Sequence, residues 1–148
     1  MSPQTFERPG LGDRVFNRVF GWLIGLGIGL AHNHLLVVRG RISGQLHSTP
    51  VDVLYYRGTL YLVAPRGQTQ WVRNALASGV VTLRKGRLRD DFTLRLVDED
   101  KRPAILKAYL DRFKPTVQRF FPVPAGSPEE RFVPLASRYP VLALTPVQ

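Results

Sequence analysis

Two short segments of the 148-residue chain hold the side chains best suited to bind an anion. The first segment, residues 40–51, reads GRISGQLHSTPV and separates two strand-like runs. Arginine forks and hydroxyl groups match phosphate oxygens, and glycines let successive N–H groups turn towards one point. The segment therefore predicts a phosphate site, and a polar turn that satisfies its own backbone is the alternative.

The second segment, residues 64–68 (APRGQ), joins an expected strand to an expected helix. The N-terminus of a helix favours a bound anion because its first N–H groups have no partner within the helix. Many strand-to-helix junctions have a similar composition. This segment therefore supports the anion site predicted from the first segment but is weak evidence for such a site alone.

No conventional catalytic group is apparent elsewhere. The chain has no cysteine, and its three histidines, at 32, 34 and 47, lack a nearby carboxylate, so no metal site is expected. Asp90 and Asp91 are neighbours on an expected strand and would point to opposite faces. A GxSxG motif is missing as well. An enzyme with this sequence would take its chemistry from a cofactor.

The charge of the chain predicts an anionic partner. Its formal net charge is +10, from 21 Lys and Arg against 11 Asp and Glu. Nucleic acid, an anionic membrane surface and a phosphorylated cofactor all fit this surplus, and so does a basic surface that only promotes solubility. Most aromatic residues lie on apolar helix faces rather than among exposed cations, so we expect no nucleic-acid partner.

Residues 11–30 predict a helix with Gly21, Gly25 and Gly29 on one face, where another backbone can approach closely. Packing of this helix on a sheet is one interpretation. A helix on a membrane surface, supported by Trp22, is the other. The uncharged run 19–31 is shorter than the roughly 20 residues that cross a bilayer. No secretory pattern precedes it, so we expect a cytoplasmic protein, with peripheral contact at the inner face of the membrane left open.

The rest of the chain predicts strands at 34–38, 49–56, 59–64, 80–84, 88–97 and 140–145. A helix is expected over 68–78, ended by Gly79, and another over 98–113, capped by Asp98 and broken by Pro115. Residues 122–137 should form a loop or a short helical lid. This order predicts a mainly β (α+β) fold, an antiparallel barrel with packed helices, with residues 1–148 as a single domain.

Together the two segments resemble those of the deazaflavin-dependent nitroreductase and quinone reductase family. GRISGQLHSTPV is similar to the family's glycine–arginine segment, and LVAPRGQTQWVRNALASG is similar to its second segment, which carries a Trp and an Asn. The resemblance covers roughly residues 11–148. It implies a flavin-reductase-like split β-barrel that binds the deazaflavin coenzyme F-420, with FMN or no cofactor as alternatives.

The resemblance also implies roles for particular residues. Arg41 and Ser43 would hold the phosphate and acidic tail of the cofactor, and Pro50 would lie beneath the deazaflavin ring. The backbone of residues 64–67 would face the pyrimidine edge of the ring, and Trp71 and Asn74 would fix the helix that walls the site. The full set of expected cofactor-binding residues is Arg39, Arg41, Ser43, Gly44, His47, Ser48, Thr49, Pro50, Ala64, Pro65, Arg66, Gly67, Gln68, Trp71 and Asn74.

Two positions depart from the family pattern. Ile42 occupies the place of the usual lysine, and His47 occupies that of a second basic residue. Each missing charged hydrogen bond would weaken cofactor binding by about 1.5–3 kcal/mol. Arg39 would compensate if it shared one face of a strand with Arg41, because residues two apart on a strand point the same way.

The implied activity is hydride transfer from reduced F-420 to a quinone, a nitroaromatic compound or a related small apolar acceptor. The acceptor would stack in an apolar mouth for which Phe121, Phe132 and Tyr139 are candidates, with core packing as the alternative for all three. The alternative function is a non-catalytic relative that binds a fatty acid, another lipid or another flavin in the same groove. A homodimer is compatible with either function.

Overall fold

The computed structural model of the chain describes residues 34–147. Its strands are β1 His34–Arg39, β2 Leu46–Val51, β3 Val53–Tyr56, β4 Thr59–Val63, β5 Val80–Lys85, β6 Leu88–Leu96 and β7 Val141–Pro146. Its helices are α2 Gln70–Ser78, α3 Arg102–Arg112 and α4 Lys114–Val117, with 3-10 helices η3 Glu99–Lys101, η4 Gln118–Phe120 and η5 Glu129–Arg138. The helix expected over 11–30 lies outside the described residues, so its contact with a membrane stays a prediction.

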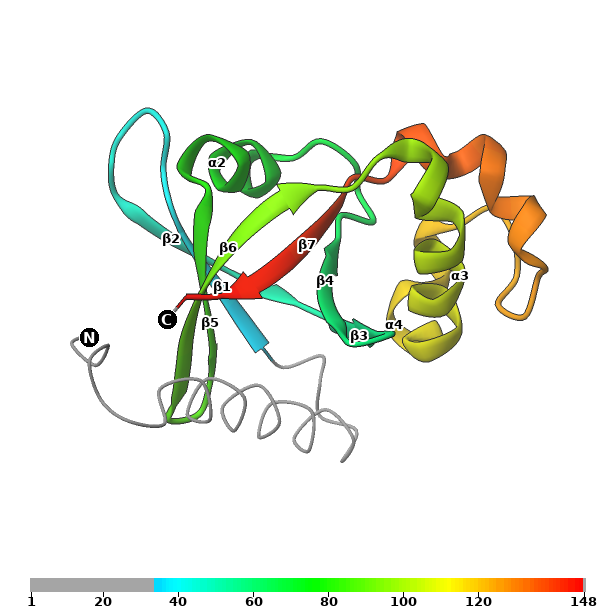
Figure 1. Ribbon diagram of the computed structural model, residues 1–148, viewed down its shortest axis with the longest axis horizontal. Helices are drawn as coiled ribbons and strands as arrows, with labels where there is room; N and C mark the ends of the chain where they lie inside the picture. Colours follow the sequence, from blue (N-terminus) through cyan, green and yellow to red (C-terminus); the bar gives the residue numbers. More distant parts are fainter. Residues whose placement is uncertain (1–33, 148) are drawn as a thin grey trace.

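All seven strands form one antiparallel sheet in the order β2-β1-β5-β6-β7-β4-β3. The two edge strands, β2 and β3, are consecutive in the chain and separated by Asp52 alone. One intervening residue spans at most about 7 Å between Cα atoms. The sheet must therefore curl until its two edges meet at Asp52, and Figure 1 shows this curvature.

The prediction of one strand over 49–56 was wrong. Residues 46–51 pair with β1, whereas residues 53–56 pair with β4 at the other edge of the sheet. The apolar run on both sides of Asp52 gives no local signal of this change of partner. One consequence is that the turn in GRISGQLHSTPV covers only residues 40–45, and the rest of the segment belongs to edge strand β2. Pro50 fits there, because an edge strand has N–H positions that need no ladder partner.

Helix α2 packs against β1, β5 and β6. Its first half lies beside the 40–45 turn. Val72 and Ala75 are buried on the inner face of this helix. The helix ends as predicted, since Gly79 has φ 76° and its N–H bonds the Ala75 carbonyl at 2.8 Å. A left-handed residue at this point closes the last turn at little cost only when it is glycine.

Helices α3, α4 and η5 form a second helical layer at the side of β3 and β4 (Figure 1). The expected helix over 98–113 begins instead as the 3-10 helix η3, and Asp98 makes no capping bond with its side chain. Arg102 anchors this start, because its buried guanidinium donates to the carbonyls of Val97 and Ala136, each at 2.9 Å. Pro115 lies in the first turn of the short α4, which begins at Lys114, so the predicted break after residue 113 is confirmed.

Within residues 34–147 no helix is long and apolar enough to cross a membrane.

Candidate functional site

The turn of residues 40–45 is closed by its own backbone. The Gly40 N–H donates to the Gln45 carbonyl at 2.7 Å, and the Gly44 N–H donates to the Gly40 carbonyl at 3.0 Å. Ser43 accepts a bond from the Gln45 N–H at 3.1 Å, and Gly44 has φ 77°. Some polar groups of the segment thus form hydrogen bonds within the turn, as the alternative interpretation expected. The cation of the turn, Arg41, is instead bound by residues outside it.

That cation, Arg41, is attached to helix α2. Asn74 Oδ1 accepts a bond from the Arg41 N–H at 3.1 Å and another from Arg41 Nη1 at 2.7 Å. Gln70 Oε1 accepts a further bond from the same Nη1 at 2.9 Å. Gln70 and Asn74 are four residues apart and therefore share one face of the helix. Asn74 is buried, so this face fixes both the backbone and the guanidinium of Arg41.

Arg39 does not join Arg41. Its Nη1 donates to the Gly44 carbonyl at 2.5 Å, and the side chain lines neither of the two pockets described below. The expectation of a shared face fails because β1 ends at Arg39 and Arg41 already belongs to the turn. Alternation along a strand applies only while the strand continues. Arg39 therefore braces the turn and does not replace the missing cofactor cations.

The turn, β2 and α2 enclose a pocket of about 570 Å³, which we call the polar pocket. The residues that line it are Gly40, Arg41, Ile42, Ser43, His47, Thr49, Thr69, Gln70, Trp71 and Asn74. His47 covers Gly40 so closely that a Cβ on residue 40 would lie 2.9 Å from His47 Nε2. A side chain at residue 40 would therefore displace the imidazole, which forms part of the wall.

The second sequence segment contributes less backbone than expected. The Ala64 N–H donates to the Pro140 carbonyl at 2.9 Å, and the Gly67 N–H donates to the Ala64 carbonyl at 3.0 Å. Proline 65 has no N–H, so Arg66 holds the free amide of this turn among the described residues. Pro65 and Arg66 line a pocket, whereas Ala64, Gly67 and Gln68 do not.

The pocket beside Pro65 and Arg66, which we call the aromatic pocket, has a volume of about 490 Å³. Its lining residues are Thr49, Pro50, Val51, Asp52, Val63, Pro65, Arg66, Thr69, Trp71, Tyr109, Thr116, Val117, Arg119 and Phe120. Thr49, Thr69 and Trp71 line both pockets. The two pockets are therefore neighbours along one groove, with these three side chains on the wall between them.

Phe121, Phe132 and Tyr139 do not form the expected acceptor mouth. All three are buried and line neither pocket. Their rings pack on one another, with centroid distances of 4.6 Å between Phe121 and Tyr139 and 6.3 Å between Phe121 and Phe132. The alternative of core packing describes them correctly. Phe120, one residue earlier, points into the aromatic pocket in their place.

Three side chains contact Phe120. The Tyr139 hydroxyl donates to its carbonyl at 2.5 Å. The guanidinium carbons of Arg66 and Arg119 lie 5.2 Å and 4.7 Å from the centroid of its ring. Both distances are within the range of cation–π attraction. No sequence pattern indicated Arg119 or Phe120, because their place in the wall depends on how α4 and η4 fold back towards β2.

Gly40, Gln70 and Thr69 were also missed. Thr69 stands immediately before α2 but makes no capping bond with its side chain. Its Oγ1 is buried and has no hydrogen-bond partner among the described residues. A Thr before a helix is usually interpreted as a cap. Here the hydroxyl on the shared wall remains available for a ligand.

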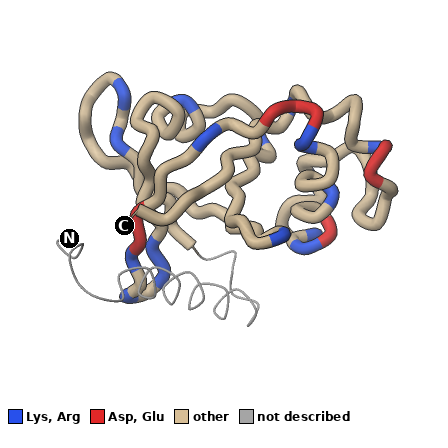
Figure 2. The backbone as a smooth tube through the Cα atoms, in the orientation of Figure 1, with Lys and Arg blue, Asp and Glu red and all other residues tan. Residues whose placement is uncertain are grey.

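Charge elsewhere on the molecule is not confined to the groove. Figure 2 shows a second group of cations at the tip of the β5–β6 hairpin, where Arg84 and Arg89 lie opposite each other in the register. Within the part of the chain that the structure describes, no cluster of His, Cys, Asp and Glu could hold a metal ion. Asp90 is buried and Asp91 is exposed, so the two carboxylates lie on opposite faces as predicted.

Comparison with known proteins decides the family. A family profile described as F420H(2)-dependent quinone reductase matches residues 14–119, well over half of the chain. The chain belongs to the F420H(2)-dependent quinone reductase family. The resemblance found in the two sequence segments is thereby confirmed. The match ends at Arg119, so Phe120 and Tyr139 of this quinone reductase family member lie beyond it.

Solved structures agree on the fold. An F420-H2 dependent reductase (FDR-A) is 19% identical over 76% of this chain and 92% of its own, with a TM-score of 0.52. A candidate pyridoxamine 5′-phosphate oxidase from Listeria innocua is 14% identical over 89% of this chain and 93% of its own, with a TM-score of 0.57. The expected split β-barrel with packed helices is thus confirmed.

A third structure, described as a domain-swapped dimer, is 16% identical over 86% of this chain and 99% of its own, with a TM-score of 0.52. Dimerisation is a property of that protein, and a homodimer of this chain stays a prediction. No curated protein sequence matches the chain.

The residues of the groove fit the cofactor that the family name implies. The polar pocket offers a fixed guanidinium at Arg41, an imidazole at His47 and hydroxyls at Ser43 and Thr49, which suit the phosphate and carboxylates of F-420. The orphaned Thr69 hydroxyl adds a donor or acceptor on the wall shared with the aromatic pocket. The Trp71 ring on the same wall suits a flat ring system.

Proposed function

We propose that this protein binds reduced coenzyme F-420 along the groove and passes a hydride to a small aromatic acceptor such as a quinone or a nitroaromatic compound. The observation that carries this proposal is the junction of two unlike pockets at Thr49, Thr69 and Trp71. One pocket has the fixed guanidinium of Arg41 and lacks proline, and the other combines Pro50, Pro65 and Phe120 with two further arginines. A cofactor with an acidic tail and a flat redox ring needs both in this order.

The polar pocket would bind the acidic tail. Arg41 is already held by Asn74 and Gln70, so binding costs little side-chain entropy. Ser43 and His47 lie on the same wall and supply further polar contacts. Ile42 supplies none, and its side chain is 87% exposed. We therefore expect weaker tail binding than a lysine at 42 would give.

The aromatic pocket would orient the acceptor. When bound, reduced F-420 would supply a hydride, and its transfer would place a negative charge on the acceptor. The Arg66 side chain and its free N–H lie on the wall of this pocket and would stabilise that charge. Pro50, Trp71 and Phe120 would exclude water and hold an acceptor ring at van der Waals distance, about 3.5 Å, from the reacting carbon.

Fluorescence titration of the purified protein with oxidised F-420 tests the proposal. We expect binding in the micromolar range, together with oxidation of reduced F-420 when a naphthoquinone is added. Arg41→Gln should weaken F-420 binding by about tenfold or more, since it removes a charged hydrogen bond. Arg131→Gln is the matched control, because Arg131 is exposed on η5 and lines neither pocket.

Two results would contradict the proposal. One is the absence of F-420 binding in a protein that purifies with a fatty acid or a flavin, which would support the non-catalytic alternative. The other is an equal loss of binding in Arg41→Gln and Arg131→Gln. In that case net charge, rather than the polar pocket, would attract the cofactor.

A further inference from the structure

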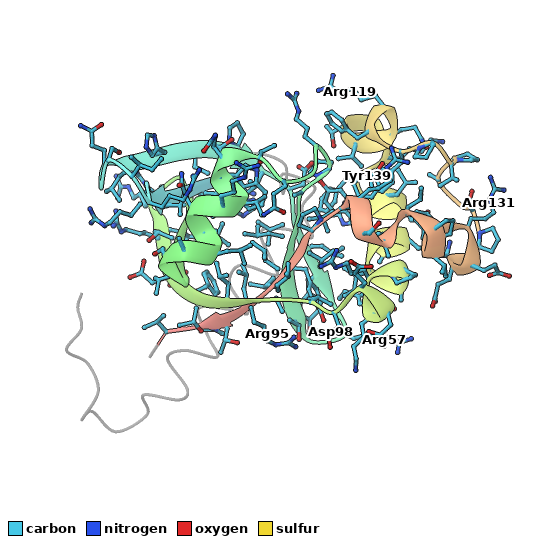
Figure 3. All side chains as sticks on the ribbon, turned by 90° about the horizontal axis from the view of Figure 1, so that it is seen from above. Arg57, Arg95, Asp98, Arg119, Arg131 and Tyr139 are labelled. Carbon is cyan, nitrogen blue, oxygen red and sulfur yellow. The ribbon has the colours of Figure 1, made fainter. Side chains whose placement is uncertain are left out.

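Arg119 occupies a position in the aromatic pocket that hydride transfer to a neutral quinone does not require. It belongs to η4 and lines the pocket beside Phe120, with its guanidinium carbon 4.7 Å from the ring centroid. Figure 3 shows Arg119 at one edge of the second helical layer and Arg131 at a different place, on η5. An exposed cation beside the ring of Phe120 needs an explanation.

A second cation, from a distant part of the sequence, lies near the same ring. Arg66 belongs to the turn between β4 and α2, and its guanidinium carbon lies 5.2 Å from the Phe120 centroid. Because both guanidinium carbons lie this close to one centroid, they are at most about 10 Å apart. Like charges at this separation repel each other, and solvent at the pocket mouth screens that repulsion only in part.

No carboxylate of the described residues forms an ion pair with either guanidinium. Asp52, the acidic residue of the pocket lining, instead accepts a bond from the Thr116 hydroxyl at 3.3 Å. Cation–π contact with Phe120 orients both arginines but does not neutralise them. The pocket thus presents an aromatic surface bordered by two forks that match a planar anion.

We propose that the acceptor is an aromatic compound that carries an acidic group, and that Arg119 binds this group while the ring stacks against Phe120 and Trp71. The proposal rests on the proposed function, since it names the substrate class of the same groove. Arg66 and Arg119 both line the aromatic pocket and not the polar pocket. The proposed function assigns Arg66 to the charge that develops during transfer, which leaves Arg119 as the cation for the acidic group of the acceptor.

Binding of two probes without cofactor tests the proposal. The probes are a naphthoquinone and the same naphthoquinone with a ring sulfonate, and the signal is Trp71 fluorescence in a Trp22→Phe background, which leaves one tryptophan. We expect the sulfonate to bind more tightly than the neutral quinone. Arg119→Gln should weaken sulfonate binding about tenfold or more, the equivalent of one charged hydrogen bond, and neutral binding less than about threefold.

Two further variants sharpen the test. Arg119→Lys keeps the charge and should recover part of the sulfonate affinity, whereas Arg131→Gln removes the same charge from η5 and should change neither probe. An unchanged sulfonate affinity in Arg119→Gln would overturn the proposal. An equal loss for both probes would also overturn it, because that result would mean that Arg119 supports only the shape of the wall.

A separate titration with F-420 distinguishes this proposal from the proposed function. If Arg119→Gln weakens F-420 binding as much as sulfonate binding, Arg119 serves the cofactor and the acceptor proposal is wrong. If the wild-type protein binds the sulfonate through Arg119 but does not bind F-420, the proposed function fails and the anion site remains. In turnover, the proposal predicts a higher KM for the sulfonate in Arg119→Gln with kcat little changed.

Discussion

The two pockets of the groove are assembled from different parts of the chain. The polar pocket takes its walls from two short stretches, residues 40–49 and 69–74. The aromatic pocket draws on residues 49–52, 63–71, 109 and 116–120, and so depends on both helical layers and on the edge of the curled sheet. The polar pocket is therefore set by the contact of two short segments, whereas the aromatic pocket also depends on the packing of α3 and α4. Mutations that act on one pocket alone test this division.

Asn74→Ala should have the largest effect and should act on the polar pocket. It removes the acceptor of two bonds from Arg41 and leaves a part-buried N–H without a partner. We expect F-420 affinity to fall by roughly 10- to 100-fold and the free energy of unfolding to fall by about 1–3 kcal/mol. Titration calorimetry and urea unfolding measure the two effects. Binding of a neutral naphthoquinone to the aromatic pocket should change little.

Gln70→Ala is the matched control for that variant. It removes the acceptor of one exposed bond from the same guanidinium, at 2.9 Å, and leaves intact the two bonds that Asn74 accepts. The loss of affinity should be several-fold smaller than in Asn74→Ala. If the two variants behaved alike, the buried face of α2 would not be what holds the cation.

Ile42→Lys should produce a smaller change, a gain. The side chain lines the polar pocket and is 87% exposed, so a lysine there can reach a bound anion without displacing another group. Exposed charge pairs contribute about 0.2–1 kcal/mol, which predicts F-420 binding that is roughly two- to fivefold tighter at low salt. The gain should shrink at high salt, whereas Ile42→Gln should show none. No gain, or a loss, would mean that residue 42 does not face the tail.

The sequence predicted those parts of the fold that local chemistry decides. The end of α2 follows from the left-handed conformation at Gly79, and the break after residue 113 follows from Pro115. The division of residues 46–56 between two sheet edges was missed because Asp52 lies in an apolar run with no turn signal. The prediction that Asp98 caps the next helix was wrong. The buried Arg102 anchors the start of that helix instead, in part through the carbonyl of Ala136, which is distant in the chain.

The candidate site shows the same limit. Arg41 and Asn74 belong to two recognisable segments, and the structure brings them into contact as one unit. Phe120 and Phe121 are adjacent and chemically identical, yet one lines a pocket and the other lies in the core. Which of the two faces the groove depends on the turn of η4 after α4. No periodicity in three residues of 3-10 helix could decide it.

Tyr139→Phe tests whether the aromatic core positions the aromatic pocket, and it should have the smallest effect on binding. The variant removes the donor to the Phe120 carbonyl but keeps the ring that stacks on Phe121 at 4.6 Å. We expect the free energy of unfolding to fall by about 1–2 kcal/mol and naphthoquinone affinity to fall less than about twofold. Tyr55→Phe is the control, because Tyr55 is exposed on β3 and should leave both quantities unchanged.

The pH dependence of stability gives this last test a second readout. Burial raises the pKa of the Tyr139 hydroxyl, and the charge of Arg138 opposes the shift in part. A pKa raised on folding means that the folded protein keeps the proton more tightly than the unfolded chain, whose tyrosines titrate at about pH 10. The hydroxyl therefore contributes its full stability below about pH 10 and loses it as the pH rises further. Tyr139→Phe should make the alkaline decline in stability shallower than in the wild-type protein. An identical decline in both proteins would mean that burial does not raise the pKa of the Tyr139 hydroxyl.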